Sequence, residues 1–207
     1  VIGCYGTFFL YFKDILLMQH SASDVAWIGS IQQFLAVLVG ILTSKWVDYG
    51  YMYAMCTVGS ILIVLGIMMN GQGTEYVHIF FSHGVCVGVG TGLIYLPCIT
   101  CCSEYHHQKP GVALGLATLG SSLGSLIFPI MFNKLQPNIG YAWTIRIIGF
   151  LVMGLLLLAL LLLRPRSRAI ESRRLFALHV FKDPVYVVFV LGYFLGNMGL
   201  YVPPYFL

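Results

Sequence analysis

Charged residues make up only 9% of this 207-residue chain, whereas soluble domains usually carry about 25%. Hydrophobic residues make up 59%, and the mean hydropathy is +0.89. This shortage of charge excludes an ordinary soluble domain and indicates an integral membrane protein. We interpret the net charge of +4 as a sign of membrane topology, and we exclude nucleic acid as a partner.

Acidic residues are missing from the apolar stretches, because all seven Asp and Glu residues lie between them. No paired carboxylates, histidine pair or metal site can be argued within those stretches, so we predict neither an enzyme nor a cofactor. Most of the six cysteines lie within the stretches, which excludes the disulfide framework of a secreted domain. Cys98, Cys101 and Cys102 precede His106 and His107 at ligand-like spacing, but no second ligand pair follows, so no metal site is predicted.

Apolar stretches long enough to span a bilayer are what the sequence has in abundance. A spanning helix needs roughly 18 or more apolar residues. Six segments qualify, and a shorter seventh opens the chain: Val25–Ser44, Tyr51–Met69, Tyr76–Cys102, Gly111–Phe132, Tyr141–Leu163 and Pro184–Leu207, with Val1–Phe12 as the short one. Since the chain begins with Val inside apolar sequence, we expect it to be a fragment of a longer protein.

Basic residues gather on one side of the predicted membrane topology. Six of them lie in the linker 164–183, and alternation of the spans places Lys45 and Lys109 on the same face, against Lys13 and Lys134 on the other. Because cytoplasmic loops are enriched in Lys and Arg, we predict that the linker is cytosolic. Ser21 and Asp24 also have the spacing of a capping box, which predicts a helix start before the second span.

The stretch "GVCVGVGTGLIYLPC" raises the choice between a phosphate-binding loop and a glycine-lined helix. No charge lies between Glu75 and Glu104, whereas a nucleotide loop needs a basic or acidic partner near a strand. Gly84, Gly88 and Gly92 recur every fourth residue, so they share one helix face and let a neighbouring backbone approach. We predict a packing helix, bent at Pro97 either as a harmless kink or beside a wet cavity.

Three segments resemble the major facilitator superfamily, and within it the fungal branch of the monocarboxylate-transporter-like family. They are "SASDVAWIGSIQQFL", "GVGTGLIYLPC" and "KPGVALGLATLGSSLGSLIFPI". The frame of the third is kept by these residues: Tyr105, Lys109, Ala113, Gly115, Ala117, Gly120, Ser121 and Gly124. Gly115, Gly120 and Gly124 are therefore expected to pack against a neighbouring helix. His106, Gln108 and Pro110 depart from the family pattern, which carries Phe and further basic residues at these places.

The resemblance implies an all-α bundle of twelve helices in two halves, each of six. Residues 1–163 would form the first half, residues 164–183 the linker, and residues 184–207 the first span of the second half. A cytosolic gate motif is implied at Gly40, Lys45, Asp48, Gly50 and Lys109, with Tyr51 and Met52 where the family has basic residues. Gly6 replaces an intramembrane Lys of lactate-carrying relatives, which argues against simple lactate transport.

Seven of the polar side chains within the predicted spans are the candidates for a solute pathway. The candidates are Gln32, Tyr95, Ser121, Ser122, Arg146, Asn197 and Tyr201. Arg146 is the one full charge well inside a span, and it either attracts an anion or snorkels to the interface. For each uncharged candidate, a hydrogen bond between helices is the alternative role.

Together these features predict a secondary transporter that moves a small organic solute, a monocarboxylate or other organic anion, by alternating access. A coupled proton and the lipid bilayer are its expected partners, and the plasma membrane its expected location. The alternative is a truncated, non-transporting membrane protein that keeps the helix packing without a complete cavity.

Overall fold

The computed structural model describes residues 9, 11–12, 21–73, 75–105, 110–163 and 184–206, and every regular element in these ranges is a helix. The elements are α2 (Ala22–Asp48), α3 (Met52–Asn70), α4 (Tyr76–Ile79), η3 (Phe80–Cys86), α5 (Val87–Tyr105), α6 (Pro110–Leu162) and α7 (Pro184–Phe206). Helix η3 is π-helical and joins α4 to α5 without a break. The predicted all-α class is confirmed, whereas the linker 164–183 lies outside the described residues.

The capping box predicted at Ser21 is present at the start of α2. The Asp24 backbone N–H donates to Ser21 Oγ at 3.2 Å, and the Ser21 backbone N–H donates to Asp24 Oδ2 at 3.1 Å. Two N–H groups that the first helical turn would leave unsatisfied are thereby paired. The Tyr76 hydroxyl also donates to the Asp24 carbonyl oxygen at 3.1 Å, which ties the start of α2 to the start of α4.

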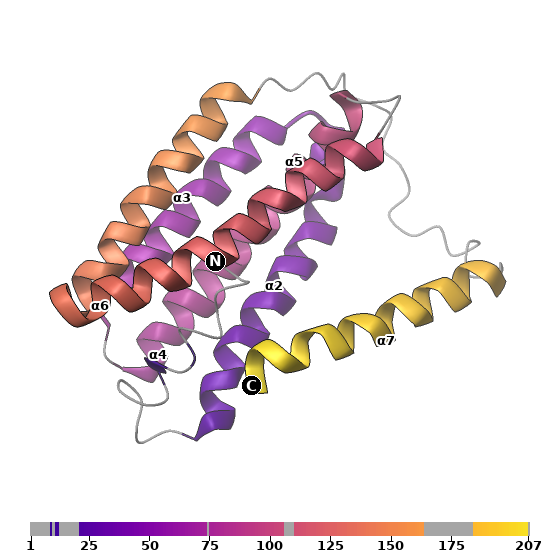
Figure 1. Ribbon diagram of the computed structural model, residues 1–207. Helices are drawn as coiled ribbons and strands as arrows, with labels where there is room; N and C mark the ends of the chain where they lie inside the picture. The colour runs from indigo at the N-terminus through magenta and orange to yellow at the C-terminus, as the bar shows by residue number, and fades with distance from the viewer. Residues whose placement is uncertain are drawn as a thin grey trace.

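Helix α6 is two helices that meet at Gly140. This glycine has φ 77° and ψ 168°, a backbone conformation that breaks the helix and that other residues rarely adopt. Figure 1 shows the two arms meeting at a sharp angle, the first crossing the bundle and the second running beside α3. The predicted boundary between the spans Gly111–Phe132 and Tyr141–Leu163 therefore falls at this break.

Four helical segments are long and apolar enough to cross a membrane: Ser23–Val47, Met52–Asn70, Tyr76–Cys102 and Leu114–Leu162. The last has 49 residues, about 70 Å of helix at 1.5 Å per residue. A bilayer core is only about 30 Å thick, so the two arms on either side of Gly140 account for two crossings. Helix α7 lies apart from the other helices (Figure 1), and its described side chains are mostly exposed.

Glycines on two faces of the continuous α4–η3–α5 rod bring its neighbours close. A methyl group added at Gly88 would lie 2.9 Å from the Gln32 carbonyl oxygen, and one at Gly92 would lie 2.6 Å from that of Ala36. Residue numbers increase in the same direction on both sides of this contact, from Gln32 to Ala36 on α2 and from Gly88 to Gly92 on the rod. The two helices therefore run parallel. On the other face, a methyl group at Gly90 would lie 2.8 Å from the Gly59 carbonyl oxygen. A methyl group at Gly59 would likewise lie 2.8 Å from the Gly90 carbonyl oxygen. The rod is therefore the central element of the bundle.

The first arm of α6 differs from the sequence-based expectation. No heavy atom lies within 4 Å of a methyl group built at Gly115 or at Gly120, and both glycines are exposed. A methyl group added at Gly124 would lie 3.5 Å from the ring of Phe128, which is four residues along the same helix. Packing of these glycines against another helix was predicted, but no such contact is made by Gly115 or Gly120 in the part of the chain that the structure describes.

Candidate functional site

The predicted pathway residues lie on four helices. Gln32 of α2 is only 1% exposed, whereas Tyr95 of α5 is 64% exposed. Ser121 and Ser122 are exposed on the first arm of α6, and the Ser122 hydroxyl donates to the Thr118 carbonyl oxygen at 3.4 Å. Asn197 and Tyr201 lie on α7, and their side chains are outside the described part. Among the described residues, the five candidates with described side chains make no hydrogen bond to one another.

Arg146 stands one turn after Trp143 on the second arm of α6. Its guanidinium carbon lies 5.1 Å from the centroid of the Trp143 ring, which is a cation–π distance. Arg146 is half-buried and Trp143 is mostly exposed. Tryptophan favours the interface between lipid and water, and this contact therefore places the Arg146 charge beside an interfacial ring.

Four of the five residues of the predicted gate motif lie in the second half of α2 and in the turn that follows it. Gly40 is buried, with the Gly92 carbonyl oxygen 3.8 Å from the position of an added methyl group, and Lys45 is exposed in the last helical turn. Asp48 ends the helix, and Gly50 follows with φ 85°, which makes the turn into α3. Lys109 lies outside the described residues.

A polar cluster that was not predicted from the sequence is buried where α3 ends. The Asn70 amide Nδ2 donates to His83 Nδ1 at 3.4 Å, and the two side chains are 1% and 2% exposed. The Tyr141 hydroxyl lies next to the Asn70 side chain without the geometry of a hydrogen bond. We name these three residues the Asn70 cluster, and it joins α3, η3 and the second arm of α6.

Aromatic rings close the Asn70 cluster on one side. Tyr11 stacks on Tyr141 with ring centroids 4.9 Å apart and planes at 9°, while Phe12 meets His83 edge-on at 6.3 Å. Phe132 packs edge-on against Tyr11 at 5.5 Å. The rings shield polar groups that would be costly to leave in contact with lipid. Asn70 Oδ1 and the Tyr141 hydroxyl still have no hydrogen-bond partner among the described residues.

The sequence contained a signal for this cluster. His83 is an ionisable residue within a spanning segment, and such residues are rare enough to be functional candidates by default. Among the ionisable residues within the spans, Arg146 alone was predicted as a candidate, because it carries a full charge. The π-helical turn that carries His83 is a further signal, since π-helical turns often mark functional sites. That signal, however, is visible only in the structure.

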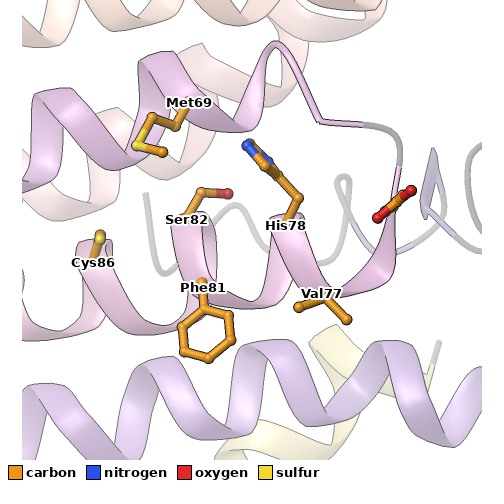
Figure 2. A pocket seen from close by; sticks show the side chains of 7 residues that line it. Met69, Val77, His78, Phe81, Ser82 and Cys86 are labelled. Atoms are coloured by element: carbon orange, nitrogen blue, oxygen red, sulfur yellow. The ribbon is translucent and has the colours of Figure 1, made fainter.

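A pocket of about 350 Å³ lies near the same end of the bundle, outside the Asn70 cluster. It is lined by Met69, Glu75, Val77, His78, Phe81, Ser82 and Cys86. Figure 2 shows His78 and Ser82 extending toward the side where α3 carries Met69, while Val77 and Phe81 point the other way. Val77 and Phe81 are both mostly exposed, so the pocket adjoins the apolar outer surface. None of the predicted pathway residues lines it.

Comparisons with a family model and with individual proteins both point to the same family. The family model described as Major Facilitator Superfamily matches residues 2–207. The chain is similar to the MFS-type transporter dbaD of Emericella nidulans, with 37% identity over 97% of this chain and 45% of the relative. It is also similar to the Fujikurins efflux protein of Gibberella fujikuroi, with 33% identity over 98% of this chain and 44% of the relative.

A third relative is the Aspyridones efflux protein apdF of Emericella nidulans, with 31% identity over 100% of this chain and 42% of the relative. The chain thus spans a little under half the length of these three relatives.

Proposed function

Because this chain belongs to the Major Facilitator Superfamily and is a multi-pass integral membrane protein, we propose that it forms part of a secondary transporter for a small organic solute. The observation that carries the proposal is the match of the family model along residues 2–207. Transport would follow alternating access, in which one helix bundle moves against another around a site near the middle of the membrane.

The direction that we propose is export from the cytosol. Two relatives are named for the efflux of fujikurins and of aspyridones, and each covers nearly all of this chain. Those names describe the relatives' solutes, and for this chain they support the direction alone. We place the complete protein in the plasma membrane. The linker 164–183 would lie on the cytosolic side, because it carries six basic residues.

The solute class that we propose is an organic anion, with monocarboxylates as the first to test. The resemblance of the three sequence segments to the monocarboxylate-transporter-like family supports this class. Arg146 supports it as well, since it is the one full charge well inside a predicted span and would attract an anion in the solute path. We propose Gln32, Tyr95, Ser121, Ser122, Asn197 and Tyr201 as further contacts along the solute path of the complete protein. The gate motif would close that path from the cytosolic side.

Flux through the complete protein reconstituted in lipid vesicles tests this proposal. Labelled lactate, pyruvate and larger aromatic monocarboxylates would be offered in turn, with protein-free vesicles as the control. We expect saturable flux of at least one of these anions, and a proton gradient imposed across the membrane would show whether a proton is coupled. Folded, correctly inserted protein that gives no saturable flux of any organic anion would contradict the proposed solute class.

A further inference from the structure

The pairing of α3 with the α4–η3–α5 rod has a constant antiparallel register. A methyl group at Gly66 would meet Cys86 and Val87, while one at Gly59, two turns earlier on α3, would meet Leu93 and Ile94. Residue numbers on the rod therefore increase along the contact while residue numbers on α3 decrease. Extending this register by one more turn toward the start of α3 places Cys56 opposite the turn of α5 that contains Cys98.

Three cysteines lie near one another at this level. Cys56 and Cys98 lie close enough across the interface between α3 and α5 for each thiol to influence the ionisation of the other, and Cys101 also lies near Cys56. All three are free thiols. Cys56 is 3% exposed and Cys98 is half-buried, so Cys98 is the more accessible of the two partners.

The glycine contacts bring α3 and α5 closer together than most packed helices. Packed helices usually have axes about 8–10 Å apart, whereas a disulfide needs Cα atoms about 4.4–6.8 Å apart. Gly59 and Gly90 lie one to two turns from the cysteines and bring the backbones so close that an added methyl group would lie 2.8 Å from the opposite carbonyl oxygen. The interface is therefore narrow at Gly59, one turn from Cys56.

We propose that Cys56 and Cys98 form an oxidant-sensitive dithiol that closes to a disulfide joining α3 to α5. The oxidant is a hydroperoxide, such as hydrogen peroxide. The Cys98 thiolate attacks the O–O bond, forms a sulfenic acid and releases hydroxide, which takes up the thiol proton to give water. The Cys56 thiol then attacks the sulfenic sulfur, the S–S bond forms, the S–O bond breaks and a second water leaves. Two electrons pass from the thiols to the peroxide.

The predicted topology gives this pair a regulatory setting. Cys56 lies one turn into α3, near the end that we expect to face the cytosol, where thiols are normally kept reduced. The dithiol is then the resting form, and peroxide stress produces the cross-link. Because Pro97 stands next to Cys98 inside α5, the cross-link would hold the helix at its proline.

Peptide mapping of the oxidised chain tests the proposal without any transport substrate. The purified chain in mild detergent would be treated with hydrogen peroxide, alkylated, digested without reductant and analysed by mass spectrometry. We expect a peptide pair joined through Cys56 and Cys98, which is lost on adding dithiothreitol. The Cys56→Ser and Cys98→Ser variants should lack it, while Cys86→Ser, a change at a half-buried free cysteine on the same rod, should keep it.

Two results would overturn this assignment. One is a wild-type chain in which Cys56 and Cys98 remain alkylated as separate thiols after peroxide treatment. The other is oxidation that joins Cys56 to Cys101, or that joins separate chains, in place of the Cys56–Cys98 bond. Since the deciding measurement is made on the wild-type chain, a variant that folds poorly does not affect it.

Discussion

Replacing Gly92 with Ala is the change that bears most directly on the packing of α2 against α5. The new Cβ would lie 2.6 Å from the Ala36 carbonyl oxygen and 2.9 Å from Val39 Cβ. Ordinary contacts between heavy atoms begin at about 3.5 Å, so the two helices must separate by up to roughly 0.9 Å. The nearest obstacle is backbone, which cannot rotate away as a flexible side chain could.

The expected magnitude follows from two opposing terms. Overpacking of a close contact costs about 1–3 kcal/mol, while Ala in place of a helical Gly returns about 0.5–1 kcal/mol. We therefore expect a net loss of about 1–2 kcal/mol in the free energy of unfolding for Gly92→Ala. Denaturant titration of the purified protein in mild detergent, followed by helical circular dichroism, measures this loss.

Gly154→Ala is the matched control. Gly154 lies on the second arm of α6, is exposed, and has no heavy atom within 4 Å of an added methyl group. The same substitution there gains helix propensity without a clash, so unfolding should be unchanged or slightly harder. If Gly92→Ala is as stable as Gly154→Ala, the close approach of α2 and α5 is not a constraint and the packing argument fails.

Further changes probe other parts of the bundle. Ser21→Ala removes the helix cap and should cost about 1 kcal/mol; an unchanged unfolding midpoint would show that the capping box does not contribute. Gly140→Ala places a side chain at φ 77° and should cost at least about 1 kcal/mol, so wild-type stability would refute a fixed break in α6. Asn70→Leu removes the amide that donates to His83 and should cost about 1–3 kcal/mol, and a variant as stable as wild type would show that the pair does not hold the helices. Arg146→Gln in the complete protein should raise the KM for an anionic solute at constant surface expression, and unchanged kinetics would remove Arg146 from the pathway.

Local and periodic features of the fold could be read from the sequence. The capping box at Ser21 depends on residues three apart, and its geometry is as predicted. The four-residue spacing of Gly84, Gly88 and Gly92 places them on one face, and the structure puts that face against α2. Such features depend on neighbours along one helix, so spacing alone is sufficient to find them.

Features that depend on how helices meet could not be read in this way. Gly90 lies on a different face of the rod from Gly84, Gly88 and Gly92. Its contact with Gly59 depends on how α3 packs against the rod, which only the structure shows. Asn70, His83 and Tyr141 come from three separate segments, and no spacing rule relates them. The helix contact that the family pattern suggests for Gly115 is not made in the described part of the chain, and it stays a prediction for the complete protein.

Counterflow tests the proposal of alternating access most directly. Vesicles containing the complete protein would be loaded with unlabelled anion at high concentration and diluted into buffer with a trace of labelled anion. A carrier that exposes its site to one side at a time predicts transient accumulation of label inside, above its equilibrium level, before decay. Simple equilibration without an overshoot, or no protein-dependent movement for any anion that the vesicles retain, would contradict the account.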